Sequence, residues 1–272
     1  MTSGNTLQER VRYVGRAARV VASHPLEGMD RIRGRTEIVL SERLPSVNGQ
    51  KPSATTTEPV RDFHELLGIE WPCPLEEDFE AAWDDLAQHM ASLGLTVGFG
   101  HDADANLAHV VWCAIRHMEP ERVLETGVAR GVTSALALGA MAKSNGEVGR
   151  LWSIDLPPMG SGWHEHSKVL VDEAAWPNWR YIRGSSWRRI KPTCASIGSI
   201  DIFIHDSLHT PQTMKNEFDK AWPFLRAGGL LISDDVEGNS VFVDFVKSRG
   251  IEKWFIAPKA DKAGLFGIAF KS

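Results

Sequence analysis

Acidic side chains and one histidine follow two apolar runs of the sequence that have the pattern of buried strands. Asp206 ends the first run, with His209 three residues further on, and Asp234 and Asp235 follow the second. Neighbouring parallel strands end at the same edge of a sheet, so we expect these side chains to share one site. Three adjacent carboxylates repel one another unless a cation lies among them, and oxygen ligands of this kind suit Mg²⁺. The pattern predicts a Mg²⁺ site formed by Asp206, Asp234 and Asp235.

Structural roles for these residues stay open. Asp234 or Asp235 could cap a helix expected to begin near Asn239, or could pair with an arginine at 188 or 189. His209 could brace the turn before the helix that Thr210 is expected to cap. In either case Asp206 and His209 are expected to share one site.

Residues 122–134 have the pattern of a nucleotide-binding turn. An apolar strand ends in the segment Glu125-x-Gly127-x-x-x-Gly131, and a helix is expected at 134–141. The free N–H groups at the start of such a helix favour an anionic group such as a carboxylate. A dinucleotide fold has the spacing G-x-G-x-x-G, and its middle glycine is missing here, which argues against NAD. An ordinary turn between a strand and a helix is the alternative interpretation.

Two further strand ends carry polar side chains. Asp155 closes the second expected strand, where an acid can accept hydrogen bonds from two ribose hydroxyls. A helix cap or turn acid is the alternative for Asp155. After the third strand, Ser186 and Trp187 follow a glycine, and Trp187 either covers a base or packs in the core.

The acid-x-Gly-x-x-x-Gly segment resembles the first motif of class I S-adenosylmethionine-dependent methyltransferases. The resemblance implies S-adenosylmethionine as cofactor, with a carboxylate contact at Thr133 and an adenine contact at Ser186. The cofactor-binding residues that it implies are Glu125, Gly127, Gly131, Thr133, Asp155, Ser186 and Asp206.

Asp-x-x-His with paired acids further on is similar to the macrocin O-methyltransferase family and related sugar O-methyltransferases. The likeness covers roughly residues 105–272, and it implies Asp206, Asp234 and Asp235 as Mg²⁺ ligands and His209 as base. The catechol O-methyltransferase branch differs, because it has lysine at the base and asparagine at the third metal position.

This resemblance predicts Mg²⁺-assisted methylation of a sugar or glycoside hydroxyl. A metal ion on the hydroxyl oxygen would lower its pKa while His209 accepts the proton and the oxygen attacks the sulfonium methyl in line. Two vicinal oxygens of a sugar diol or a catechol would chelate the ion equally well, and the histidine base favours the sugar. A catechol-type aromatic O-methyltransferase, a non-catalytic binding protein and a nicotinamide oxidoreductase are the alternatives.

Strand and helix patterns alternate from residue 122 onward. Strands are expected near 122–126, 151–155, 179–183, 200–206, 228–233, 252–257 and 265–270. This alternation predicts an α/β fold, a Rossmann-like, mostly parallel seven-stranded sheet with helices on both faces. Helices near 79–93 and 105–118 precede the first strand, so we expect a methyltransferase domain at 61–272, with a helical lead-in at 61–120 and the core at 121–272.

The first sixty residues have a different composition. Residues 1–43 carry eight arginines against five acids and predict a helical extension outside the core, resting on a dimer mate, on another partner or peripherally on an anionic membrane. Residues 44–60 are rich in Pro, Ser, Thr, Asn and Gly and predict a linker or mobile loop. The loops at 96–104 and 157–166 could act as lids over the site. His164 and His166 in the second lid are interpreted as surface histidines.

Composition limits the partners and the compartment. A net charge of −5 and a pI near 6.1 give no general attraction to nucleic acid, so a small-molecule or oligosaccharide acceptor is expected. The three cysteines, Cys73, Cys113 and Cys194, are odd in number and lack metal-binding spacing, which favours reduced, structural thiols. No apolar run is long enough for a transmembrane segment, and no signal sequence is recognisable. We expect a cytoplasmic homo-oligomer.

Overall fold

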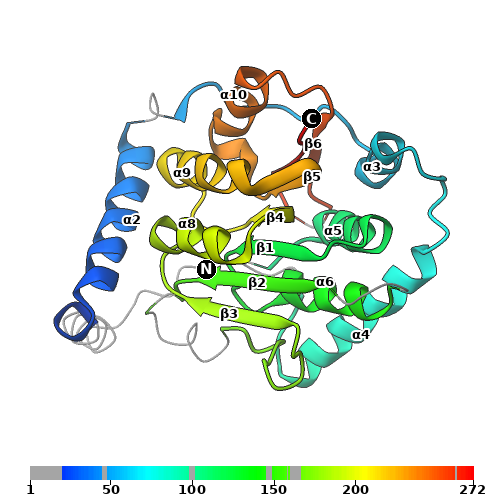
Figure 1. Ribbon diagram of the computed structural model, residues 1–272, viewed down its shortest axis with the longest axis horizontal. Coiled ribbons are helices and arrows are strands. Elements are labelled where there is room, and N and C mark those ends of the chain that lie inside the picture. Colours follow the sequence, from blue (N-terminus) through cyan, green and yellow to red (C-terminus); the bar gives the residue numbers. More distant parts are fainter. Residues whose placement is uncertain are drawn as a thin grey trace.

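The computed structural model describes residues 20–44, 48–97, 102–144, 149–157, 159, 167–260 and 262–272. Its centre is a seven-stranded sheet with the order β3-β2-β1-β4-β5-β7-β6 (Figure 1). The strands are β1 (Arg122–Thr126), β2 (Arg150–Asp155), β3 (Trp179–Arg183), β4 (Ile200–His205), β5 (Leu225–Ser233), β6 (Trp254–Pro258) and β7 (Leu265–Phe270). The predicted α/β fold with a mostly parallel seven-stranded sheet is confirmed.

The order of the strands reverses between β1 and β4. β1 pairs in parallel with β2 on one side and with β4 on the other, whereas β7 runs antiparallel to both β5 and β6. Ligands of doubly wound sheets bind beyond the carboxyl ends of the strands at such a reversal. The topology therefore directs attention to the residues that follow β1, β2, β4 and β5.

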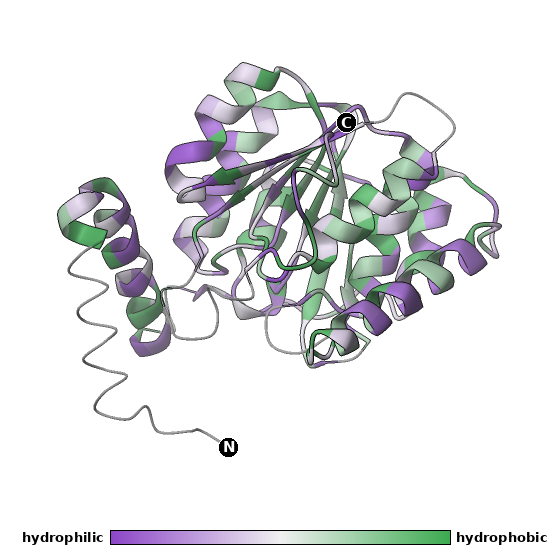
Figure 2. Ribbon diagram, turned by 90° about the horizontal axis from the view of Figure 1, so that it is seen from below, coloured by the Kyte–Doolittle hydropathy of each residue, from purple (hydrophilic) through white to green (hydrophobic). Residues whose placement is uncertain are grey.

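Helices cover both faces of the sheet (Figure 1). One face packs against α3 (Pro59–Leu67), α4 (Glu76–Ser92), α5 (Ala105–Met118) and α6 (Val132–Ala142), and the other against α8 (Ser186–Ile197), α9 (Pro211–Ala221) and α10 (Val241–Ser248). Successive strand residues serve opposite cores, since Val123 packs on the first and Leu124 on the second. Apolar residues accordingly concentrate in the strands and on the inner sides of the helices (Figure 2). Two 3₁₀ turns, η2 (Trp222–Phe224) and η3 (Val236–Gly238), flank β5.

Local capping signals fix the helices next to the sheet's carboxyl edge. The Asp104 carboxylate accepts the Leu107 N–H at 2.8 Å and caps α5. Thr210 Oγ1 accepts the Thr213 N–H at 3.4 Å and caps α9, with Pro211 in the first position as the sequence predicts.

The described part of the expected linker, residues 48–58, is bound to the core. The backbone N–H of Thr55 donates to the carbonyl of Ile256 in β6 at 2.7 Å, and the Ile256 N–H donates back to Thr55 Oγ1 at 2.9 Å. The Ser240 N–H donates to the carbonyl of Asn48. Composition suggested a mobile loop because the segment has little apolar surface to bury, but hydrogen bonds to an edge strand provide its order instead.

The basic N-terminal extension contains α2 (Pro25–Arg43), which lies against α9 (Figure 1). The carboxylate of Glu37 is buried and accepts hydrogen bonds from Thr210 Oγ1 at 2.6 Å and Thr213 Oγ1 at 2.7 Å. Nearer its start, Asp30 accepts from Arg188 of α8 at 2.8 Å. Polar contacts therefore anchor α2 to the core. Its outward side exposes an apolar row, Leu26, Met29, Ile32 and Leu40.

Within the part of the chain that the structure describes, no helix is long and apolar enough to cross a membrane.

We predict that Glu37→Ala loosens α2 without unfolding the core. The substitution leaves the hydroxyls of Thr210 and Thr213 without their buried acceptor, which costs about 1–3 kcal/mol. Hydrogen exchange should accelerate across residues 25–43 and stay unchanged in β1 and β4. Glu42→Ala, at an exposed position of the same helix, is the matched control. Equal exchange in both variants would show that Glu37 does not anchor α2.

Candidate active site

The backbone places Asp206 and Asp234 side by side. His205 and Ser233 are register partners in β4 and β5, and each aspartate is the next residue along its chain. The Asp206 N–H donates to the Thr126 carbonyl at 2.8 Å, and the Asp234 N–H donates to the His205 carbonyl at 2.9 Å. The parallel ladder thus continues one residue beyond the strands and holds both acids at the sheet's edge.

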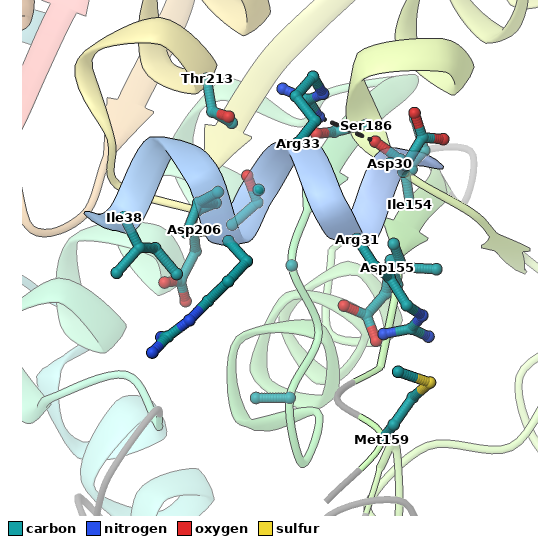
Figure 3. Close-up of a pocket in the computed structure, with 18 residues that line it drawn as sticks. Asp30, Arg31, Arg33, Ile38, Ile154, Asp155, Met159, Ser186, Asp206 and Thr213 are labelled. Atoms are coloured by element: carbon teal, nitrogen blue, oxygen red, sulfur yellow. Dashed lines mark hydrogen bonds between the residues drawn. The ribbon is translucent and has the colours of Figure 1, made fainter. Parts of the chain in front are cut away.

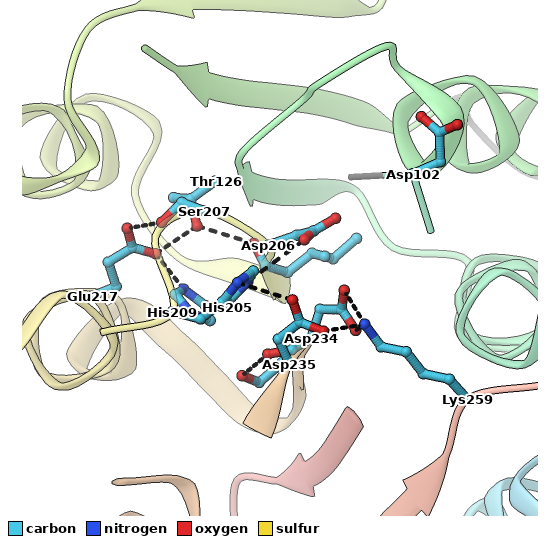
Figure 4. A network of polar contacts seen from close by, with 12 residues as sticks. Asp102, Thr126, His205, Asp206, Ser207, His209, Glu217, Asp234, Asp235 and Lys259 are labelled. Atoms are coloured by element: carbon cyan, nitrogen blue, oxygen red, sulfur yellow. Dashed lines mark hydrogen bonds and ion pairs between the residues drawn. The ribbon is translucent and has the colours of Figure 1, made fainter. Parts of the chain in front are cut away.

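Two cationic side chains lie among the acids (Figure 4). Lys259, which directly follows β6, places Nζ 2.8 Å from Asp234 Oδ2 and also contacts the carboxylate of Asp235. His209 places Nδ1 3.2 Å from Asp235 Oδ2 and Nε2 3.6 Å from Asp206 Oδ1. The structure therefore brings together all four residues that the sequence grouped. Lys259 was missed, although its place after an expected strand was a usable signal.

Crowding of negative charge shifts the pKa values of the cluster. Burial and the charges of Asp206 and Asp235 raise the pKa of Asp234 to about 7. Burial opposes ionisation of Asp235 as well, but His209 and Lys259 outweigh it and hold the pKa of Asp235 below its usual range. Burial lowers the pKa of Lys259, but the charges of Asp234 and Asp235 raise it by more, so the pKa lies above its usual range.

His209 responds to the same charges. Burial lowers its pKa, but Asp206 and Asp235 outweigh the burial and raise the pKa to about 10. With both carboxylates bare, the imidazole carries a proton at neutral pH. The ring can act as a base only when the negative charge that it faces is reduced.

A buried carboxylate supports this cluster from below. Glu217 of α9 accepts hydrogen bonds from Thr126 Oγ1 and Ser207 Oγ, both at 2.5 Å, and lies 2.6 Å from His205 Nδ1. The ring of His205 in turn meets the ring of His209 edge-on, with centroids 5.4 Å apart. Glu217 thus fixes the turn between β4 and α9 that carries Asp206 and His209.

A cavity of about 420 Å³ adjoins Asp206 (Figure 3). Its sheet side includes Gly127, Asp155, Ser186 and Asp206, and its other side is formed by residues 30–38 of α2. This volume is typical of a small-molecule site. Four of the seven expected cofactor-binding residues therefore line one space.

α2 forms the roof of this cavity. Arg31 Nη2 donates to the Pro157 carbonyl at 2.9 Å, and Arg33 Nη2 donates to Ser185 Oγ at 3.4 Å. The sequence predicted a helix here but placed it outside the core, because a basic segment with few apolar residues gave no sign of what it covers.

Asp155 and Gly127 have specific local roles. Burial raises the pKa of Asp155 to about 6, although the N–H groups of Val128 and Leu156 donate to its carboxylate, and Tyr181 Oη lies 3.4 Å away. Gly127 has a φ of +84°, and a Cβ there would collide with the backbone carbonyl of Asp206. Glycine is thus required at 127 because the loops after β1 and β4 touch.

Three expected cofactor residues lie deeper. The buried Glu125 carboxylate accepts from Ser134 Oγ at 2.5 Å and Ser153 Oγ at 2.6 Å, and burial raises its pKa to about 8. Gly131 is the N-cap of α6, and Thr133 lies buried in the helix's first turn. Among the described residues that line the cavity, Glu125, Gly131 and Thr133 do not occur.

The two expected lids fall largely outside the described residues. His164 and His166 lie in the undescribed 160–166, and 98–101 is likewise undescribed. Of the first loop, Asp102 is buried and accepts from Arg130 Nη1 at 3.1 Å. Burial raises the pKa of Asp102 to about 6 against the lowering effect of Arg130.

Residues 124–236 match a protein family described as a methyltransferase domain. This stretch of the chain is similar to methyltransferase domains. The matched segment begins in β1 and ends just after Asp235, so it contains the glycine-rich turn, the floor of the cavity and the acidic cluster with His209. The expectation of a methyltransferase is confirmed at this level. A search of curated proteins found no relative of the chain.

Solved structures share the fold of this methyltransferase domain. The O-methyltransferase TomG from Streptomyces achromogenes, involved in tomaymycin synthesis and solved with S-adenosylmethionine, is 17% identical, with a TM-score of 0.54 over 79% of this chain and 96% of that one. An O-methyltransferase from Bacillus cereus in complex with SAH is 14% identical, with a TM-score of 0.54 over 79% and 98%. At these identities the likeness concerns the fold.

Proposed function

We propose that the methyltransferase domain transfers the methyl group of S-adenosylmethionine to a hydroxyl of a sugar or glycoside. The observation that carries the proposal is that Asp206 borders both the cavity and the cluster of His209, Asp234 and Asp235. A donor in the cavity and an acceptor at the cluster would then meet at one residue. Fold neighbours solved with S-adenosylmethionine or SAH support this cofactor.

The cavity residues suit the parts of the cofactor. The buried carboxylate of Asp155 can accept hydrogen bonds from ribose hydroxyls, and Ser186 at the start of α8 can contact the adenine. Gly131 and Thr133, at the N-terminus of α6, do not line the cavity, so their proposed contact with the methionine carboxylate rests on the sequence motif and on the free N–H groups of that helix end. Residues 30–38 of α2 would cover a cofactor bound in this cavity.

The acidic cluster fits a divalent cation. Asp206, Asp234 and Asp235 supply hard oxygen ligands, and three carboxylates against the single charge of Lys259 leave a surplus of negative charge when His209 is neutral. Burial, together with the charges of Asp206 and Asp235, raises the pKa of Asp234. Lys259 competes with a metal for Asp234 and Asp235, but it cannot compensate all three acids.

The residues of the chain supply the remaining chemistry. The chemistry that Mg²⁺ supplies when bound is polarisation of a hydroxyl oxygen and compensation of the charge that His209 faces. Nδ1 of His209 is directed to Asp235, while Nε2 makes no hydrogen bond to a described residue and can accept the hydroxyl proton. The acceptor oxygen then bonds to the methyl carbon as the carbon–sulfur bond breaks, which leaves S-adenosylhomocysteine and a protonated His209.

An aromatic diol is a second candidate acceptor. Vicinal oxygens of a catechol would meet the same carboxylates, and Lys259 places a lysine within the cluster. The histidine three residues after Asp206 favours the sugar. Turnover with a panel of glycosides and catechols decides between them, and cofactor binding with turnover of neither would indicate a non-catalytic binding protein.

We predict that Asp155→Asn weakens S-adenosylhomocysteine binding about 10- to 100-fold, because charged hydrogen bonds to the ribose contribute about 1.5–3 kcal/mol. Isothermal titration calorimetry measures the change, with the exposed Asp172→Asn as control. NAD should not bind either protein. An unchanged affinity in Asp155→Asn would remove this residue from the cofactor site.

We predict that a chelator stops turnover and that Mg²⁺ alone restores it. Asp235→Asn should weaken the metal effect because one charge leaves the site. Lys259→Met removes the competing cation. The unfolding temperature of this variant should therefore rise more steeply with added Mg²⁺ than that of the wild type. Full activity in the presence of chelator, together with unfolding temperatures that do not change with Mg²⁺ in either protein, would show that these acids have a structural role only.

We predict that His209→Ala lowers kcat by about 10²- to 10⁴-fold through loss of the general base. Affinity for S-adenosylhomocysteine should stay close to that of the wild type, because His209 does not line the cavity. His89→Ala, at an exposed position of α4, controls for the substitution itself. Near-normal kcat at neutral pH would exclude His209 and make Asp206 the next candidate.

A further inference from the structure

Two cysteines and two histidines converge at the C-terminal half of α5, away from the Asp104 end that borders the acidic cluster. His64 lies in α3, Cys73 in the turn before α4, and Cys113 and His117 one helical turn apart in α5. One ligand atom from each of the four lies within 4.8 Å of the others. Cys73 and Cys113 were expected to be merely structural because their spacing in sequence matches no metal motif; the fold supplies the missing proximity.

The ring of His64 has the orientation expected of a metal ligand. His64 Nδ1 lies 2.6 Å from the carbonyl oxygen of Glu70. A carbonyl only accepts, so Nδ1 carries a hydrogen and the neutral ring keeps its lone pair on Nε2. That Nε2 is buried and has no hydrogen-bond partner among the described residues. A carbonyl that fixes one ring nitrogen and leaves the other for a metal is the usual support of a metal-bound histidine.

The sulfurs face the same point. His117 Nε2 lies 3.6 Å from Cys73 Sγ, and the rings of His64 and His117 meet edge-on with centroids 5.0 Å apart. Both cysteines are buried, at 5% and 1% exposed surface.

Charge and ligand type select the ion. Two sulfurs and two imidazole nitrogens form the tetrahedral set typical of structural Zn²⁺. Two thiolates and one Zn²⁺ sum to zero net charge, which makes such a buried site tolerable. All four ligands come from the protein, which leaves no open position for a substrate.

We propose that His64, Cys73, Cys113 and His117 bind one structural Zn²⁺. Binding releases two protons to solvent, one from each thiol, as two Zn–S and two Zn–N bonds form. The ion would join α3, the turn before α4 and the C-terminal half of α5. At the other end of α5, the Asp104 carboxylate accepts the Ala260 N–H at 2.9 Å, next to Lys259. The site would thus hold the helix that borders the acidic cluster.

The test uses the full chain, purified under reducing conditions, with zinc content measured by mass spectrometry. We expect one Zn²⁺ per chain and, after replacement by Co²⁺, the visible spectrum of a tetrahedral thiolate site. Cys113→Ser and His64→Gln should lose Co²⁺ affinity by at least about tenfold. Cys194→Ser, a buried thiol of α8 outside the group, should keep the spectrum, and so should Asp235→Asn in the proposed Mg²⁺ site.

Two results from metal and thiol analysis would overturn the proposal. One is that the wild-type protein binds neither Zn²⁺ nor Co²⁺ more tightly than Cys113→Ser does. The other is a disulfide between Cys73 and Cys113 in protein purified without reductant or added metal, together with no zinc in the reduced protein. If the variants fail to fold, the wild type still decides. Chelation should lower the unfolding temperature of the wild type and make two more thiols accessible to a thiol reagent. Both changes should be reversed by Zn²⁺ but not by Mg²⁺. If chelation changes neither quantity, the proposal is likewise overturned.

Discussion

Repulsion among Asp206, Asp234 and Asp235 is the constraint on which the rest of the site depends. The parallel ladder extends past β4 and β5 and fixes two of these acids by their own backbone N–H groups, so they cannot move apart. Positive charge must come to them instead. The buried Lys259 contacts Asp234 and Asp235, and His209 lies between Asp206 and Asp235. The Mg²⁺ site that we propose rests on the negative charge that the cluster keeps beyond these two cations.

Holding this strained arrangement requires support on both sides. Below the cluster, Glu217 orders Thr126, His205 and Ser207, the backbone that carries Asp206. Above the neighbouring cavity, α2 is tied down by Glu37 on α9. The same helix α9 therefore positions the chemistry through Glu217 and anchors the roof through Thr213. A disturbance of α9 would therefore reach both His209 and the helix that covers the cavity.

The sequence was most informative where local chemistry decides the structure. Strand ends, the Thr210 cap and the glycine-rich turn depend on neighbours in the chain, so the sheet, its order of elements and the grouping of Asp206, His209, Asp234 and Asp235 could be predicted. Lys259 reaches the acids because β6, separated from β5 by the antiparallel β7, runs parallel to β5 and ends at the same edge of the sheet. The roof of α2 and the group of Cys73, Cys113 and two histidines depend on packing between distant helices, which no local spacing records. Glu125 was expected at the cofactor, but its carboxylate is engaged by Ser134 and Ser153 below the cavity.

The segment that precedes the matched methyltransferase region contributes to the site through α5. The match begins at residue 124, after α5 has ended, yet Asp104 caps α5 and also accepts the Ala260 N–H, and Asn106 donates to the Pro258 carbonyl at 3.1 Å. Those two bonds flank Lys259 on either side. The position of the buried lysine, and with it the charge left for a metal among the aspartates, therefore depends on a helix outside the matched region. The two metal sites that we propose stand at opposite ends of that helix and differ in kind, with hard carboxylate oxygens at one end and sulfur and imidazole at the other. Their ligands prefer different ions, so Mg²⁺ and Zn²⁺ would not compete for the same place.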